Sequence, residues 1–222
     1  MSRPYVRSED RRRQIVAVAL ELIAEHGVRG ATLNRIARGV GLTTAALYGH
    51  FPNRREILLA AMDQVFEKVR ELHRSAAGPN ALERLRQIGV RHMEMASSAD
   101  ARAFFEFIAA PPDEGLREAL GARQLTLVED LAEIVREGRA QGTIRADVDA
   151  TYVAWTIISR SWTEDVSYLM GISEHWIGPR SERMLEEILE RIGVAETAPS
   201  TRQQTAAASG PPASGESGRT RD

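Results

Sequence analysis

The chain has 222 residues and a hydrophobic content of 43%, which is enough to fill the cores of one large or two modest domains. The absence of cysteine excludes a disulfide framework and a thiolate metal site, and it agrees with a reducing cytoplasm. No stretch approaches the roughly 20 apolar residues that a membrane helix needs, and the first residues lack the apolar region of a signal peptide. We therefore expect a soluble, cytoplasmic protein that makes no contact with a membrane.

The net charge of −2 argues against a nucleic-acid binder, but it hides an uneven distribution. Residues 1–60 hold ten arginines and five acidic side chains, a balance of +5, which leaves −7 for the rest of the chain. A basic N-terminal part joined to an acidic body places any phosphate-binding surface at the N-terminus.

In chain order, residues 1–7 have the composition of a flexible basic arm. A first helix is predicted from Ser8, because acidic residues in its first turn suit the helix dipole and its apolar positions recur at helical spacing. Gly27 is the expected end of this helix. The positions predicted to form its buried face are Ile15, Val18, Ala19, Leu22 and Ile23.

Residues 32–55 have the pattern of two short helices around a glycine turn, which is typical of a helix-turn-helix that reads DNA. Thr32 and Thr43 are good N-caps, and Gly41 supplies the permissive backbone that a tight turn needs. The predicted inner side comprises Leu33, Ile36, Ala37, Val40, Leu42, Leu47 and Phe51. The positions left facing outward are Thr44, Ala45, Ala46 and Tyr48.

A fourth helix, capped by Asn53, is predicted to run from Arg54 to about Arg74, which is roughly 30 Å and long enough to link two domains rigidly. A cluster of helix breakers at residues 76–80 marks the domain boundary. Further helices are predicted at residues 81–97, at 100–110, from a cap at Asp113 to about 138–142, at 149–170 and at 180–192.

The fold class that these elements predict is all-α, since no segment shows convincing strand alternation and no internal repeat is present. Residues 8–75 would form a three-helix DNA-binding domain with its connecting helix, and residues 80–194 a C-terminal helical bundle. Residues 195–222 contain too few large apolar side chains to fold, so a disordered tail is expected.

Four ordered motifs make the N-terminal pattern specific. They are A-x-x-L-I-x-E-x-G at 19–27, T-x-x-x-I-A at 32–37, G-L-T-T-A-A-L-Y-G-H-F at 41–51 and P-N-R-R-E-I-L at 52–58. In this combination the chain resembles the tetracycline-repressor-like (TetR) family of bacterial transcription regulators. Beyond residue 75 only the architecture and a G-T-I-R-A-D-V-D stretch at 142–149 resemble that family. The resemblance implies that residues 80–194 serve ligand binding and dimerisation.

The resemblance also implies roles for the exposed residues of the helix-turn-helix. The residues nearest the base edges, where a threonine can donate or accept and an alanine methyl can touch thymine, would be Thr44, Ala45 and Ala46. The residues that contact phosphates would be Thr32, Thr43, Tyr48, His50 and Arg54. The run at residues 11–13 is either a solvated face or a further DNA contact. The expected partner is double-stranded DNA with a palindromic operator, bound by a homodimer whose recognition helices lie roughly 34–36 Å apart.

The second half is rich in aromatic and methionine side chains, which line ligand pockets in helical domains but also fill ordinary cores. The candidate pocket residues are His92, Met93, Phe104, Phe105, Tyr152, Trp155 and Trp162. The resemblance further implies that the last two helices pair with their mates in a second copy. Candidate residues for that interface are Met184, Leu185, Ile188 and Leu189.

The sequence contains no catalytic motif, phosphate loop or metal-ligand spacing, so we expect no enzymatic activity, no cofactor and no metal. The predicted function is a homodimeric, ligand-responsive repressor that a small apolar or amphipathic effector releases from its operator by a population shift. Two alternatives stay open. One is a regulator of the same kind without an effector, whose C-terminal half serves only dimerisation or a protein partner. The other is a helical enzyme with an incidental N-terminal motif.

Overall fold

The computed structural model describes residues 8–95, 98–111 and 115–194. Within them there is no β-strand, only an isolated bridge between Ile144 and Gly193, so the predicted all-α fold is confirmed. The helices are α1 (Ser8–Gly30), α2 (Leu33–Gly39), α3 (Thr44–Leu47), α4 (Arg54–Ser75), α5 (Ala81–Met95), α6 (Ser98–Ile108), α7 (Leu116–Gln141), α8 (Ala150–Leu169), the short 3-10 helix η2 (Ser173–His175) and α9 (Pro179–Ile192). The predicted arm at 1–7, the cap Asp113 and the tail at 195–222 lie outside the described residues. None of the described helices is long and apolar enough to cross a membrane.

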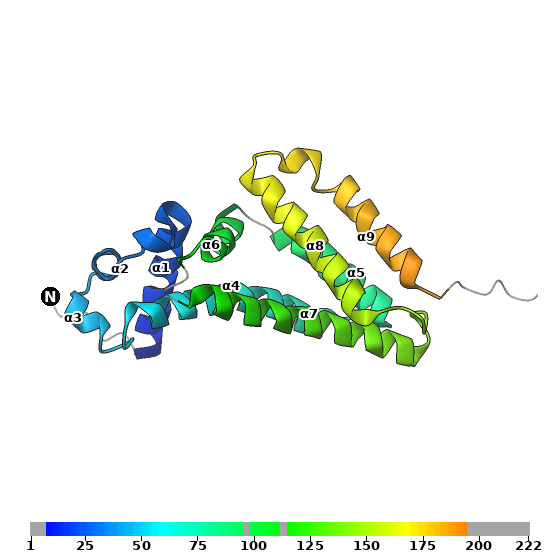
Figure 1. The fold of residues 1–222 in the computed structure, drawn as a ribbon, viewed down its shortest axis with the longest axis horizontal. Coiled ribbons are helices and arrows are strands. Elements are labelled where there is room, and N and C mark those ends of the chain that lie inside the picture. The colour runs from blue at the N-terminus through cyan, green and yellow to red at the C-terminus, as the bar shows by residue number, and fades with distance from the viewer. Residues whose placement is uncertain (1–7, 96–97, 112–114, 195–222) are drawn as a thin grey trace, which may run out of the picture.

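The helices form an elongated molecule, with α1, α2 and α3 gathered at one end (Figure 1). α4 and α7 pack against each other along the long axis, and α8 and α9 pack together at the other end. α5 contacts α7, α8 and α9, whereas α6 lies against α1 as well as α8. The C-terminal bundle is therefore joined to the N-terminal helices through both α4 and α6.

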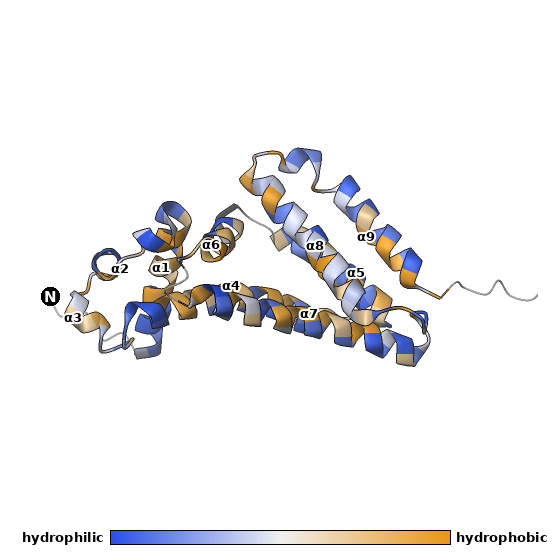
Figure 2. Cartoon of the chain, in the orientation of Figure 1, coloured by the Kyte–Doolittle hydropathy of each residue, from blue (hydrophilic) through white to orange (hydrophobic). Residues whose placement is uncertain are grey.

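Hydrophobic and hydrophilic stretches alternate along α4, α7 and α9, so these helices are amphipathic (Figure 2). Buried aliphatic side chains from the helix-turn-helix, such as Ile36, and from the bundle, such as Leu85 and Leu131, belong to one continuous hydrophobic cluster. The N-terminal helices thus pack onto the bundle through a shared core.

Side-chain caps fix where several helices begin. Thr32, Thr43, Asn53 and Asp149 each accept a hydrogen bond from the backbone amide three residues on, at 3.3, 3.1, 2.9 and 3.0 Å. Such a cap satisfies one of the amides that the first helical turn leaves without a partner. The first three caps are those that the sequence predicted, and they set the boundaries of α2, α3 and α4.

α1 is kinked at Gly27, which adopts a φ of 71° and a ψ of 170°. The sequence predicted that the first helix ends at this glycine, whereas helical geometry resumes after the kink and continues to Gly30. A positive φ favours glycine. In addition, a Cβ atom at Gly27 would lie 2.7 Å from the Glu106 carboxylate of α6. Glycine is therefore needed for the bend, whereas the Glu106 carboxylate, at the end of a flexible side chain, could move aside.

The stretch at 142–149 fastens the end of α9 to the bundle. Ile144 is 1% exposed and fills the space above Gly138, where a Cβ atom would lie 2.6 Å from the isoleucine side chain. The amide of Arg145 donates to the carbonyl of Ile192 at 2.9 Å. The loop between α7 and α8 therefore holds the last turn of α9 in place.

Candidate nucleic-acid interface and internal cavity

The turn between α2 and α3 holds these two helices as one compact unit. Gly41 has a φ of 67°, and the amide of Leu42 donates to the carbonyl of Ala37 at 2.8 Å. On the inner side Leu47 and Phe51 are only 1% and 2% exposed. Since these two side chains fix α3 from behind, its outer side is left on the molecular surface.

That outer side carries Thr44, Ala45 and Ala46, which were predicted to lie nearest the bases, and Tyr48, which was predicted to contact phosphates. Ala45 and Ala46 are exposed, and Tyr48 is 54% exposed. Thr44 is half-buried, and its hydroxyl donates to the side-chain oxygen of Asn34 on α2 at 2.8 Å. This bond ties the start of α3 to α2 and leaves the hydroxyl oxygen of Thr44 as an acceptor. Asn34 was not singled out by the sequence pattern.

Arg12 of α1 supports the end of α3. Its guanidinium lies over the Phe51 ring, 3.9 Å from the ring centroid, and donates to the backbone carbonyl of His50. The neighbouring Arg13 pairs with Asp10 on its own helix. Arg12 therefore joins α1 to the exit from α3, a role that the run of arginines at 11–13 did not reveal by itself.

Arg54, the first residue of α4, is half-buried and points into its own domain. Its Nε donates to the carbonyl of Ala31 at 2.8 Å, and its Nη2 donates to the carbonyl of Val28. The side chain thus fastens the segment between α1 and α2 to the start of α4. Its predicted contact with a DNA phosphate stays a prediction.

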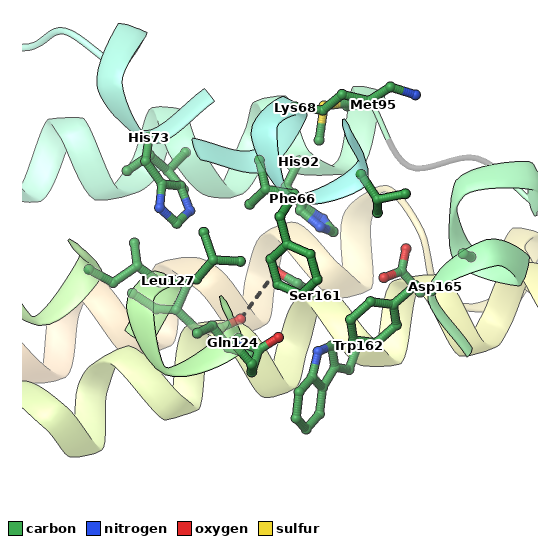
Figure 3. A pocket seen from close by; sticks show the side chains of 18 residues that line it. Phe66, Lys68, His73, His92, Met95, Gln124, Leu127, Ser161, Trp162 and Asp165 are labelled. Carbon is green, nitrogen blue, oxygen red and sulfur yellow. Dashed lines mark hydrogen bonds between the residues drawn. The ribbon is translucent and has the colours of Figure 1, made fainter. Parts of the chain in front are cut away.

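A cavity of about 90 Å³ lies inside the bundle between α4, α5, α6, α7 and α8 (Figure 3). Its wall is largely aromatic and aliphatic, and the rings of Phe66 and Phe104 lie 6.0 Å apart, with Trp162 6.4 Å from Phe104. The lining residues are Val65, Phe66, Lys68, Val69, His73, Ile88, His92, Met95, Ala101, Phe104, Gln124, Leu127, Leu131, Ile157, Ile158, Ser161, Trp162 and Asp165.

Of the predicted pocket residues, His92, Phe104 and Trp162 line this cavity and the others lie elsewhere. Met93 is buried in the protein core. Phe105 packs edge-on against Phe104, and Trp155 packs against Trp162, so both stand behind lining residues. Tyr152 is 69% exposed in the first turn of α8. The residues that α4 contributes to the cavity wall are not predicted by the sequence, in which the pattern of α4 indicates only a connecting helix.

Two buried polar side chains of the cavity have no internal partner. His73 is 7% exposed, and its Nδ1 atom is buried without a hydrogen bond. Burial, with a smaller contribution from His92, lowers the pKa of His73 to about 4. Gln124 is 8% exposed, and its side-chain amide makes no hydrogen bond to the described residues. Both groups are therefore uncharged and free to bind a ligand.

A buried ionic network lies next to the cavity and joins α5, α8 and α9. Arg160 and Glu164 are both fully buried and pair on α8. Arg160 also donates to the Ser181 hydroxyl at 2.5 Å and to the Gly89 carbonyl at 2.8 Å, and burial lowers the pKa of its guanidinium. Glu164 Oε2 lies 2.7 Å from Nδ1 of His92, a cavity residue. The network therefore connects the cavity wall to α9.

The structure corrects the predicted dimer interface. Leu185 and Leu189 are 0% and 2% exposed because α9 packs on α5 and α8 of the same chain, where Leu185 lies on Gly89. They are therefore not available to a second copy. Met184 and Ile188 are half-buried and, together with Tyr152, border a surface hollow of about 180 Å³ between α8 and α9.

Comparison with known proteins agrees with this geometry. The family model described as bacterial regulatory proteins, tetR family, matches residues 15–61, which span most of α1 to the first turns of α4. The transcriptional repressor KstR2 of Mycobacterium tuberculosis is 27% identical over 174 residues, which cover 73% of this chain and 83% of KstR2. Residues 15–61 therefore form a DNA-binding domain of the tetR-family kind.

Solved structures of other proteins share the fold of this chain. Salmonella enterica GusR matches with a TM-score of 0.72 at 18% identity, covering 85% of this chain and 98% of GusR. AibR, solved in complex with isovaleryl coenzyme A and operator DNA, matches with a TM-score of 0.57 at 24% identity, covering 82% and 98%. The family-model match and the relatives' names support a DNA-binding transcription regulator with a helix-turn-helix.

Proposed function

We propose that this protein is a homodimeric repressor that leaves its operator when a small, largely apolar effector occupies the cavity. The main observation behind the proposal is that α4 takes part in both the DNA-binding unit and the cavity wall. This helix begins directly after the helix-turn-helix and also lines the cavity with Phe66, Val69 and His73. With 22 residues it is about 33 Å long, so a shift at the cavity moves α3 with it.

For DNA recognition we propose that Thr44, Ala45 and Ala46 meet the base edges while Tyr48 contacts the backbone beside the groove. Three observations support this: the alanines are exposed, Tyr48 is 54% exposed, and the surrounding 60 residues carry an excess of arginine. The proposed phosphate contacts also include Thr32, Thr43, His50 and Arg54. The Arg54 guanidinium also donates to the carbonyls of Ala31 and Val28, so a phosphate would have to share it with these contacts.

For dimerisation we propose the outer faces of α8 and α9. Because Leu185 and Leu189 are used inside the protomer, the contact would rest on Tyr152, Met184 and Ile188. One four-residue recognition helix buries too little surface for operator affinity, whereas two of them can read successive major grooves. The distance between the two copies of α3 then decides whether the operator fits.

Effector control follows if the ligand prefers a state in which the α3 helices are wrongly spaced. The ligand shifts the equilibrium only by its difference in affinity for the two states, so roughly 10⁴-fold discrimination is needed for complete release. AibR, whose fold is similar, was solved with both isovaleryl coenzyme A and operator DNA, which supports a fold that holds both kinds of partner.

The DNA part of the proposal is tested by fluorescence anisotropy on duplexes selected from a genomic DNA pool. Tyr48→Ala should weaken binding to every duplex about tenfold, since a phosphate contact carries no sequence information. Thr44→Ala should instead change the preferred operator. Leu125→Ala, at a 60% exposed position on α7, is the matched surface control and should change neither. Unchanged affinity of Tyr48→Ala for all duplexes contradicts the assignment.

The effector part is tested by thermal unfolding with a panel of apolar compounds. A compound present at about 100 times its Kd should stabilise the folded state by about 2.7 kcal/mol. The same compound must lower operator affinity. Stabilisation without release of DNA would contradict the coupling, and a panel without any stabilising compound would favour the regulator without an effector.

A further inference from the structure

The cavity contains polar groups that call for a partner of definite chemistry. Nδ1 of His73 is buried without a hydrogen bond, and Gln124, which is 8% exposed, lines the same cavity with its side-chain amide. Buried polar groups are nearly always hydrogen-bonded, and an exception requires an explanation. In Figure 3 the side chains of His73, His92 and Gln124 reach toward the same space from α4, α5 and α7. A ligand between them would supply the missing bonds.

The charges around the cavity are balanced. Burial and His92 lower the pKa of His73 to about 4, so its imidazole is neutral at neutral pH. The charged lining residues are Lys68 and Asp165, of opposite sign. Glu164, which lies behind His92, is already paired with Arg160. An anionic group at the His73 end would therefore be buried without a cation to compensate it, which is costly.

The volume limits the part of a ligand that can be enclosed. At about 90 Å³ the cavity is smaller than the roughly 150 Å³ apolar cavity that takes up benzene, so it has room for one ring or one short chain with slight expansion. Lys68 is the exposed residue of the lining, and Figure 3 places it together with Met95 on the side away from Gln124. Any longer part of the ligand would leave the cavity on this side.

We propose that the effector is an uncharged apolar molecule carrying a hydroxyl group, and that His73 and Gln124 recognise this hydroxyl. This inference rests on the proposed function, because it gives the chemical class of the effector for the same cavity. A hydroxyl donates one hydrogen bond and accepts others, so it can serve an imidazole nitrogen and an amide together. A carbonyl or carboxylate only accepts, and a hydrocarbon leaves both groups without partners.

Three probes of similar size separate these possibilities: phenol, toluene and benzoate. Their binding to the full-length protein is measured at neutral pH by calorimetry and thermal unfolding. Phenol should bind about tenfold more tightly than toluene, as expected for hydrogen bonds formed with groups that were left without partners. Benzoate should bind more weakly than either. Equal binding of phenol and toluene, or strongest binding of benzoate, overturns the inference.

Variants of the two polar residues assign the preference to them. In His73→Phe the preference for phenol should fall below about threefold while toluene still binds, since the ring is kept and the nitrogens are lost. Gln124→Leu is a second variant of similar shape for the case that His73→Phe disturbs the fold. Leu125→Ala, at a 60% exposed position on α7 that is not part of the cavity lining, is the control and should keep the full preference.

The outcomes distinguish the inference from the proposed function. If toluene and phenol bind equally, the hydroxyl assignment fails while the cavity remains an effector site. If phenol binds with the expected preference but leaves operator affinity unchanged, the ligand class stands and the repressor mechanism fails. If none of the probes binds or stabilises the protein, the inference is overturned together with the assignment of this cavity.

Discussion

Replacement of Arg160 by methionine should strongly destabilise the bundle, because it leaves a carboxylate buried without its cation. Arg160 and Glu164 are both fully buried, and Arg160 also binds Ser181 and the Gly89 carbonyl. After the change Glu164 keeps Ser181 and His92 as neighbours but no longer has an arginine. Removing one partner of a buried pair costs about 3–5 kcal/mol. At roughly 2–4 °C per kcal/mol for a chain of this size, Tm should fall by about 10 °C.

Urea unfolding followed by circular dichroism measures this effect. The double variant Arg160→Met/Glu164→Leu should recover most of the loss, since replacing a whole buried pair by apolar residues is often neutral. Arg183→Met, which breaks an exposed pair with Glu187 at the same spacing on α9, is the matched control and should leave the midpoint unchanged. If the double variant is less stable than Arg160→Met, the reasoning from a stranded carboxylate is refuted.

Three further predictions concern pH, packing and assembly. The pKa of His73 is about 4 in the folded protein and 6.5 in the unfolded chain, so the unfolded chain binds this proton first as the pH falls. The free energy of unfolding should therefore decrease by up to about 3 kcal/mol between pH 6.5 and pH 4. Urea titrations of the protein and of His73→Phe over this pH range measure the part of the decrease that comes from His73. Gly138→Ala would place a Cβ atom 2.6 Å from Ile144 and 2.7 Å from Ala81 Cβ and should cost about 1–3 kcal/mol, whereas Gly121→Ala on the same helix has open space and should be neutral or stabilising; equal urea midpoints would contradict this. Ile188→Glu should convert a dimer to monomers in analytical ultracentrifugation, while Leu125→Glu, on α7, should not; a dimeric Ile188→Glu variant would exclude the proposed interface.

The local features of the fold were predictable from the sequence because they depend on nearby residues. Thr32, Thr43 and Asn53 cap helices through amides only three residues on, and Gly41 turns the chain within the same segment. The order and kind of the helices follow from such signals and from apolar periodicity. The exposed side of α3 follows as well, since Leu47 must be buried.

The features that depend on contacts between distant helices were not predictable. Leu185 and Leu189 have the same amphipathic spacing whether the partner of α9 is α5 or a second copy, and only the packing on Gly89 decides. His73 lies near the end of a helix predicted to be a connector, so its burial depends on the bundle helices that pack against α4, among them α5 and α7. Periodicity reports that a face is buried, but it does not report what covers that face.

The position of the cavity explains how a small ligand could reach the DNA-reading unit. Two of the helices that line the cavity, α4 and α6, also contact α1. A movement of either helix at the cavity therefore reaches α1 directly, without intermediate side chains. On α6, Phe104 lines the cavity while Glu106, two residues on, lies against the kink of α1 at Gly27. A ligand that displaces Phe104 would therefore shift the α6 turn that carries Glu106 and so move α1. Its contact with Phe66 would move α4 in the same way. A ligand in the hollow between α8 and α9 would touch neither helix and could alter only the pairing of the protomers. Control of α3 spacing from the cavity thus requires only that α4 and α6 move as rigid bodies, which their packing against α1 and α7 allows.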